Sequence, residues 1–164
     1  MLAYARFEIV RTLRSVRYLV LVAGLPVVLE LLFGSRTHAD FHDGGVTFAV
    51  FYATAMVAWA AMGAAINASG FRLAAERAAG WLRQLRITPL SDSAWLGGKL
   101  AQALFLVIPA ATLVVLAAVT IGGAHLAAGR WLGLLVVALV GAIPFAFLGL
   151  VIGQGVDAEA AQAA

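Results

Sequence analysis

Residues 76–99 read ERAAGWLRQLRITPLSDSAWLGGK and form the longest polar, charge-bearing segment in a very hydrophobic chain. When the sequence is projected at about 100° per residue from Arg72, charged and apolar side chains separate onto two faces. The polar face carries Arg72, Glu76, Arg77, Arg83 and Arg86, and the apolar face carries Ala74, Ala78, Trp81, Leu82 and Leu85. The pattern predicts an amphipathic helix that ends at Thr88-Pro89, because proline disfavours helical geometry in the residue before it.

This segment lies between two hydrophobic runs that are each long enough to cross a bilayer, which takes about 20 residues. An amphipathic helix in such a place either lies on the membrane surface or docks on a soluble partner. The function of the chain depends on which of the two it does.

The composition is that of an integral membrane protein. The chain is 63% hydrophobic and 12% charged, with a mean hydropathy of +0.99. Soluble domains are about 45–50% apolar and about 25% charged. Without cysteine there is neither a disulfide framework nor a thiolate metal site. The net charge of +3 does not indicate nucleic-acid binding, because the basic residues flank hydrophobic runs, where they set topology.

Four hydrophobic runs predict an all-α bundle of four membrane spans, at 18–33, 46–66, 100–121 and 131–152. The chain then divides into an interfacial helix at 1–17, two spans at 18–70 with an outward loop at 34–45, and a cytoplasmic segment at 71–99. Two further spans follow at 100–153, and a cytoplasmic tail at 154–164.

Prolines and glycines add local expectations. Pro26, Pro109 and Pro144 lie inside spans, where proline kinks a helix. Gly149 and Gly153 form a G-x-x-x-G face that lets another helix approach closely, and a second pair with this spacing is Gly129 and Gly133.

The first 17 residues predict an interfacial elbow helix. Apolar residues fall on one face, and basic residues cluster on the other: Leu2, Ile9, Leu13 and Val16 against Arg6, Arg14 and Arg17. A basic amphipathic helix before a span is typical of a segment that lies in the headgroup layer, held by anionic lipid. The alternative is that these arginines only fix topology.

Two polar features lie at and within the first outward loop. Glu30 lies one turn before Gly34 at the end of the first span, and an ionisable residue at membrane depth is a functional-site hypothesis by default. The alternative is that its carboxylate reaches the interface and is solvated. In the loop, His38 and His42 would share one face if helical, as a metal site requires, but the flanking glycines favour a solvated loop without metal.

The charges predict the orientation. Of the eleven Lys and Arg residues, four lie in 1–17 and five in 71–99, whereas only Arg36 and Arg130 lie in the two alternate loops. The excess places the N-terminus, the central segment and the C-terminus in the cytoplasm.

Catalytic motifs are missing from the sequence. It contains no G-x-x-x-x-G-K-[ST] phosphate loop, no H-E-x-x-H and no G-x-S-x-G. We therefore expect neither an enzyme nor a cofactor bound by this chain.

The central segment resembles that of the permease subunits of ATP-binding-cassette exporters of the second integral-membrane type. This family includes drug, antibiotic, polysaccharide and lipid exporters. The matching residues are Glu76-Arg77, Gly80, Leu82, Gln84-Leu85, Thr88-Pro89-Leu90 and Gly98-Lys99. The likeness covers nearly the whole chain, through the elbow, the outward loop and the F-x-x-x-G-L-x-I-G ending at 145–153.

The resemblance implies a cytoplasmic ATPase subunit that binds ATP and docks on the segment from Arg72 to Pro89 as on a coupling helix. It implies that Glu76 faces the ATPase, that Arg77, Arg83 and Gln84 make polar contacts, and that Trp81 and Leu85 pack on the bundle, with Gly80 and Pro89 as helix breaks. A drug-like, antibiotic or lipid-type substrate would cross the bacterial cell membrane between this chain and a second copy or paralogue.

The chain departs from the family in one respect, because the family has six spans and this sequence has four. We therefore expect a product that lacks the last two spans. The alternative function is a truncated or non-transporting membrane scaffold derived from such a permease.

Overall fold

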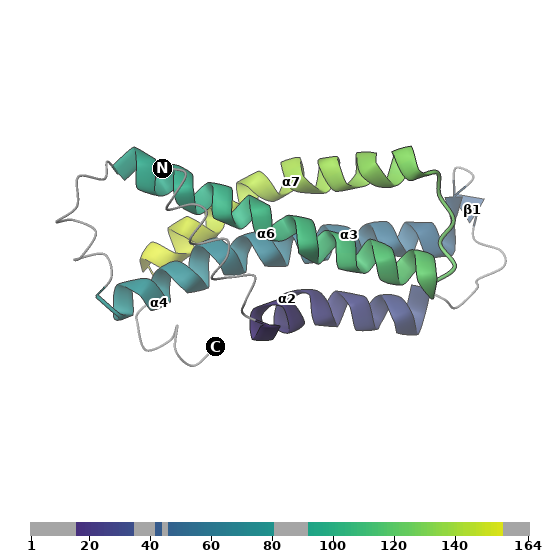
Figure 1. The fold of residues 1–164 in the computed structure, drawn as a ribbon, viewed down its shortest axis with the longest axis horizontal. Helices are drawn as coiled ribbons and strands as arrows, with labels where there is room; N and C mark the ends of the chain where they lie inside the picture. Colours follow the sequence, from purple (N-terminus) through teal and green to yellow (C-terminus); the bar gives the residue numbers. More distant parts are fainter. Residues whose placement is uncertain (1–15, 35–41, 44–45, 81–91, 156–164) are drawn as a thin grey trace.

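The computed structural model describes residues 16–34, 42–43, 46–80 and 92–155, which form a bundle of helices (Figure 1). In chain order the elements are α2 (Val16–Leu29), the π-helical turn η1 (Glu30–Gly34), β1 (His42–Asp43), β2 (Val46–Thr47), α3 (Phe48–Ile66), the π-helical turn η2 (Asn67–Phe71), α4 (Arg72–Ala78), α6 (Asp92–Thr120) and α7 (Ala128–Gly155).

Three of the helices are long and apolar enough to cross a membrane. They cover Phe48–Arg77, Trp95–Thr120 and Ala128–Gly155, with 30, 26 and 28 residues. They match the predicted second, third and fourth spans. The predicted first span corresponds to α2 and η1, whose apolar part within the described residues, Val22–Gly34, is shorter than the other three.

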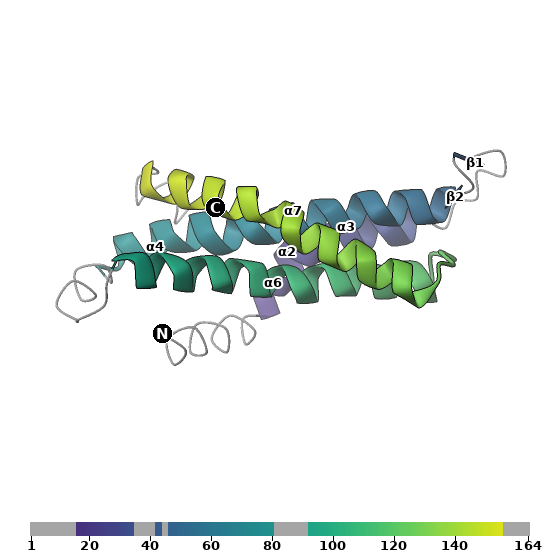
Figure 2. The same ribbon diagram turned by 90° about the horizontal axis from the view of Figure 1, so that it is seen from above.

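The long helices run lengthwise beside one another, and α2 lies along only one half of the bundle (Figures 1 and 2). The β1–β2 pair and residues 121–127 are at the end of the bundle where α2 finishes (Figure 2). At the opposite end α4, the start of α6 and the end of α7 come together (Figure 1).

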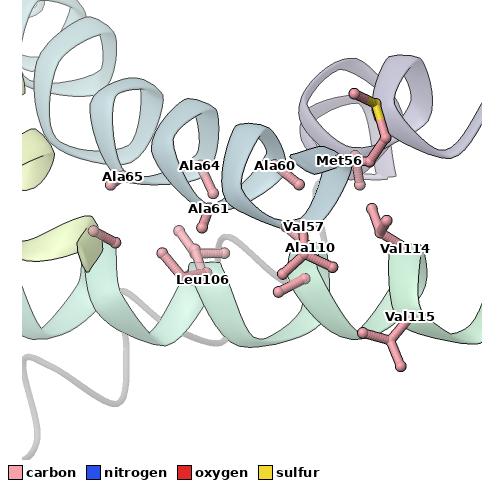
Figure 3. Close-up of a cluster of buried hydrophobic side chains, with 14 of the residues drawn as sticks. Met56, Val57, Ala60, Ala61, Ala64, Ala65, Leu106, Ala110, Val114 and Val115 are labelled. Atoms are coloured by element: carbon pink, nitrogen blue, oxygen red, sulfur yellow. The ribbon is translucent and has the colours of Figure 1, made fainter. Parts of the chain in front are cut away.

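Helix α3 lies at the centre of the bundle together with α6, because each of them packs against the other and against α2 and α7. Its contact with α6 is built from small side chains: Val57, Ala60 and Ala61 face Leu106 and Ala110 across the interface (Figure 3). Small residues let two backbones approach closely, which favours van der Waals packing where lipid gives helices no hydrophobic reason to associate.

Several predicted boundaries move. The third span was expected to begin at residue 100, but α6 begins at Asp92, so Lys99 lies two turns inside the helix. Helix α7 extends beyond 131–152 at both ends. Helices α2, α6 and α7 each continue through their proline. Part of the predicted outward loop is a small antiparallel pair, with His42 opposite Thr47 and Asp43 opposite Val46.

Some predictions fall outside the described residues. They concern the elbow up to residue 15, His38, residues 81–91 of the central segment and the tail from residue 156.

Candidate functional site

The end of the bundle at α4 holds a buried ion pair. The Lys99 ammonium donates to both carboxylate oxygens of Glu76, and each Nζ–Oε distance is 2.6 Å. Lys99 is fully buried and Glu76 is 5% exposed. Charge-assisted hydrogen bonds of this length are among the strong ones, and two charges at such depth are tolerated because each neutralises the other. Arg72 lies at the edge of the pair, with its Nε 3.9 Å from Glu76 Oε1.

The next residue of α4 makes a second connection. The Arg77 guanidinium donates to the carbonyl of Gly153 at 3.0 Å and also to the carbonyl of Gln154. Both carbonyls belong to the last turn of α7, where helix carbonyls have no intrahelical partner. A cation there also interacts favourably with the negative end of the helix dipole.

Glu76 and Arg77 are adjacent in sequence but hold different helices. Glu76 joins α4 to α6 through Lys99, and Arg77 joins α4 to the end of α7. We call Glu76, Arg77 and Lys99 the ionic junction. Because α3, η2 and α4 follow one another without a break, the junction ties the end of the second long helix to the third and fourth.

Glycines bring α7 against η2 beside the junction. A Cβ on Gly149 would lie 2.1 Å from Ser69 Oγ, and a Cβ on Gly153 would lie 2.5 Å from the Gly70 carbonyl oxygen. The predicted packing role of Gly149 and Gly153 is therefore confirmed. The second pair, Gly129 and Gly133, packs against nothing in the described part of the chain: an added Cβ would meet no atom within 4 Å.

Gly80 ends the helical part of the central segment. It follows α4 with φ at +70°, the left-handed conformation that favours glycine, and its N–H donates to the Arg77 carbonyl. The amphipathic helix predicted to run to Thr88-Pro89 is thus interrupted after Ala78. Trp81, Arg83, Gln84, Leu85 and Pro89 lie outside the described residues.

The burial of Glu76 differs from the face expected for it. The helical projection puts it among exposed arginines, but its carboxylate turns into the bundle because Lys99 lies two turns inside α6 and reaches it. The sequence carried a signal for this pairing: a lysine next to an apolar run is costly unless it is paired. Gln102, one turn further along α6 than Lys99, is also fully buried, and its burial was not predicted from the sequence.

Glu30 lies at the opposite end, and it is completely buried. The alternative in which its carboxylate is solvated is therefore wrong. Among the described residues neither carboxylate oxygen has a hydrogen-bond partner. The carboxyl group is flanked by Gly34, where an added Cβ would lie 2.4 Å from Oε1, and by Gly122, where it would lie 3.1 Å away.

A further feature lies between these two ends, at the contact of α3 with α7. An apolar groove of about 240 Å³ is lined by residues from both helices, among them Ala58, Met62, Val137 and Phe145. Its single hydroxyl, on Thr54, donates to the Val50 carbonyl of its own helix. Within the described residues no group of three His, Cys, Asp or Glu side chains could hold a metal ion.

Comparison with known proteins gives one relative. The chain is 26% identical over 146 residues to "Putative transport permease YvfS" of Bacillus subtilis (strain 168). The match covers 89% of this chain and 59% of the relative, so the chain spans about three fifths of the relative's length. No protein-family model and no solved structure matches the chain.

Proposed function

We propose that the chain is the membrane permease subunit of an ATP-driven exporter, in which a separate cytoplasmic ATPase subunit supplies the energy. The ionic junction carries this proposal. It links three long helices next to residues 81–91 in the sequence, the segment in which we expect the ATPase to dock. Likeness to a transport permease along most of the chain supports it.

In this proposal the coupling segment from Arg72 to Pro89 has two parts. Glu76 and Arg77 hold α4 to its neighbours, because Glu76 is paired with Lys99 inside the bundle and Arg77 binds carbonyls at the end of α7. The ATPase contacts fall to Arg83 and Gln84, with Trp81 and Leu85 against the bundle or the bilayer. Gly80 and Pro89 are the ends of the docking part.

The junction gives a physical route for the movement. A displacement of residues 81–91 acts on α4 and is passed to α6 by the Glu76–Lys99 pair and to α7 by Arg77. Packed helices with short charge-assisted contacts move as a body, since separating a buried pair would leave uncompensated charges in the bundle. Closure of an ATPase dimer would thereby change the spacing of three spans at once, and a substrate would cross between this chain and a second copy or paralogue.

The substrate class we propose is drug-like, antibiotic or lipid-type. The groove between α3 and α7 is apolar along its walls, and its hydroxyl already donates within α3. Such a surface favours hydrophobic molecules and offers a polar one little to compensate for its lost hydration.

Co-purification from the native host tests the function. The tagged chain is solubilised in mild detergent, and Arg83→Glu is compared with Arg130→Glu, which lies in the first turn of α7 at the other end. We expect an ATP-binding subunit with the native chain and with Arg130→Glu, and its loss with Arg83→Glu. Glu76→Arg is unsuitable because it breaks the internal pair with Lys99.

If no ATP-binding subunit accompanies the native chain, the proposal fails and a non-transporting scaffold explains the chain better. The same follows if Arg83→Glu and Arg130→Glu reduce the association equally, because the effect would then not depend on the coupling segment.

A further inference from the structure

Glu30 is a buried acid that the coupling of an ATPase does not use. It begins η1, at the end of the bundle away from the ionic junction, and none of its side chain is exposed. Its two carboxylate oxygens have no hydrogen-bond partner among the described residues. Buried carboxyl groups are normally paired, hydrogen-bonded or bound to a metal, so this one calls for a ligand.

The surroundings leave room only for a very small ligand. An added carbon atom on Gly34 or Gly122 would come within 2.4 Å or 3.1 Å of Glu30 Oε1. A metal ion would need several oxygen ligands, and the described residues contain no group of three His, Cys, Asp or Glu side chains that could hold one. A proton needs no further ligand, and a neutral carboxyl group costs far less to bury than a carboxylate.

We propose that Glu30, cradled by Gly34 and Gly122, is a proton-binding site that closes this end of the bundle. With the proton bound, the neutral acid packs under residues 121–127. When that segment separates from η1, water reaches the carboxyl group and accepts the proton. A Cβ on Gly34 would displace the acid, and a Cβ on Gly122 would press on both the acid and the Ala118 backbone.

Other titratable groups border the site and have to be distinguished from Glu30. On α3, Tyr52 packs against Phe33 of η1, with ring centroids 6.4 Å apart. The charged residues of α6, Asp92 and Lys99, lie toward its other end. His125 is exposed in the segment 121–127, and β1 contributes His42 and Asp43 to this end of the bundle.

Linkage fixes the sign of the pH effect. The closed end binds one proton more than the open end, so a rise in pH favours opening. One proton changes the opening equilibrium by at most about tenfold per pH unit. The proposal does not depend on the ATPase, and the isolated chain in lipid nanodiscs is enough to test it.

The chain has no cysteine, so single reporters can be introduced without background. Ala124→Cys reports opening, because Ala124 is fully buried in the segment 121–127. Ala127→Cys, exposed in the same segment, is the matched control. The ratio of their reaction rates with a water-soluble thiol reagent removes the intrinsic pH dependence of the thiol.

We expect this ratio to rise with pH by up to about tenfold per unit, to stay low and flat in Glu30→Gln, and to keep its rise in His125→Ala. A flat ratio in the native chain, or an unchanged rise in Glu30→Gln, overturns the proposal. Should Glu30→Gln not fold, the infrared carbonyl band of a protonated carboxyl group in the native chain decides: it must be present at low pH and fade as the ratio rises.

Discussion

Lys99 shows how a single residue can set the structure of a helix end. Its ammonium group is fully buried, and the Glu76 carboxylate accepts two hydrogen bonds of 2.6 Å from it. Removing one partner leaves the other as an uncompensated charge inside the bundle, which is far worse than removing both.

We therefore expect Lys99→Met to lower the free energy of unfolding by about 3–5 kcal/mol. The double variant Glu76→Lys/Lys99→Glu restores an ion pair of opposite polarity and should recover a large part of that loss. Thermal unfolding in detergent measures both. Equal melting temperatures for Lys99→Met and the native chain would show that the pair does not stabilise the bundle.

The glycines of α7 allow a second residue-scale prediction. Gly149→Ala places a Cβ 2.1 Å from Ser69 Oγ and 2.9 Å from the Ile66 carbonyl oxygen, so we expect it to destabilise the bundle by about 1–3 kcal/mol. Gly141→Ala in the same helix meets no atom within 4 Å and should be neutral or stabilising by up to about 1 kcal/mol. Denaturation of the two variants side by side measures the difference, and an equal effect of both would contradict the close approach of α7 to η2.

At the scale of elements, sequence reasoning succeeded where one property accumulates along a helix. The spans of α3, α6 and α7 were predicted because many apolar residues add up over about 20 positions. The burial of Glu76 in α4 was not predicted, because helical projection treats a helix as isolated. It put Glu76 on an exposed face, although a lysine 23 residues further along the chain draws it into the bundle.

The β1–β2 pair was missed for a different reason. We took residues 34–45 as an outward loop, although Gly44 and Gly45 separate the paired residues Asp43 and Val46 and a Gly-Gly step is a hairpin signal. Strands of two residues are too short to show the alternation of apolar and polar residues by which strands are recognised.

Arg77 gives a prediction about one element, the end of α7. Arg77→Gln removes a cation that binds the carbonyls of Gly153 and Gln154, and such a contact contributes about 0.3–1 kcal/mol. Hydrogen exchange of the amides of residues 151–155 should accelerate by about twofold to fivefold. Arg130→Gln is the matched control in the same helix, because a cation in the first turn opposes the helix dipole and its loss should not loosen the end. Equal exchange in Arg77→Gln and the native chain would contradict the cap.

At the scale of the whole molecule, the two ends of the bundle differ in chemistry. Among the described residues, one end holds the Glu76–Lys99 pair and the Arg77 contact with α7, while the other holds an acid without a hydrogen-bond partner between two glycines. If the chain works as a permease, the end with the ionic junction suits the side on which a partner pushes, since that end must transmit the movement to the other helices. The end at Glu30 suits the side that opens, because the Glu30 carboxyl group makes no hydrogen bond to the described residues that would hold this end closed.

This division predicts the orientation of the bundle, and the charges of the sequence predict the same orientation independently. Nine of the eleven Lys and Arg residues lie in 1–17 and 71–99, which predicts that the end at α4 lies in the cytoplasm. In intact cells, Ala127→Cys should react with a membrane-impermeant thiol reagent, whereas Ala79→Cys should react only after permeabilisation. Both alanines are exposed in the structure, so burial does not explain a difference. If Ala79→Cys alone is labelled in intact cells, the orientation is the opposite of the predicted one. The segment proposed to meet an ATPase would then face away from any source of ATP.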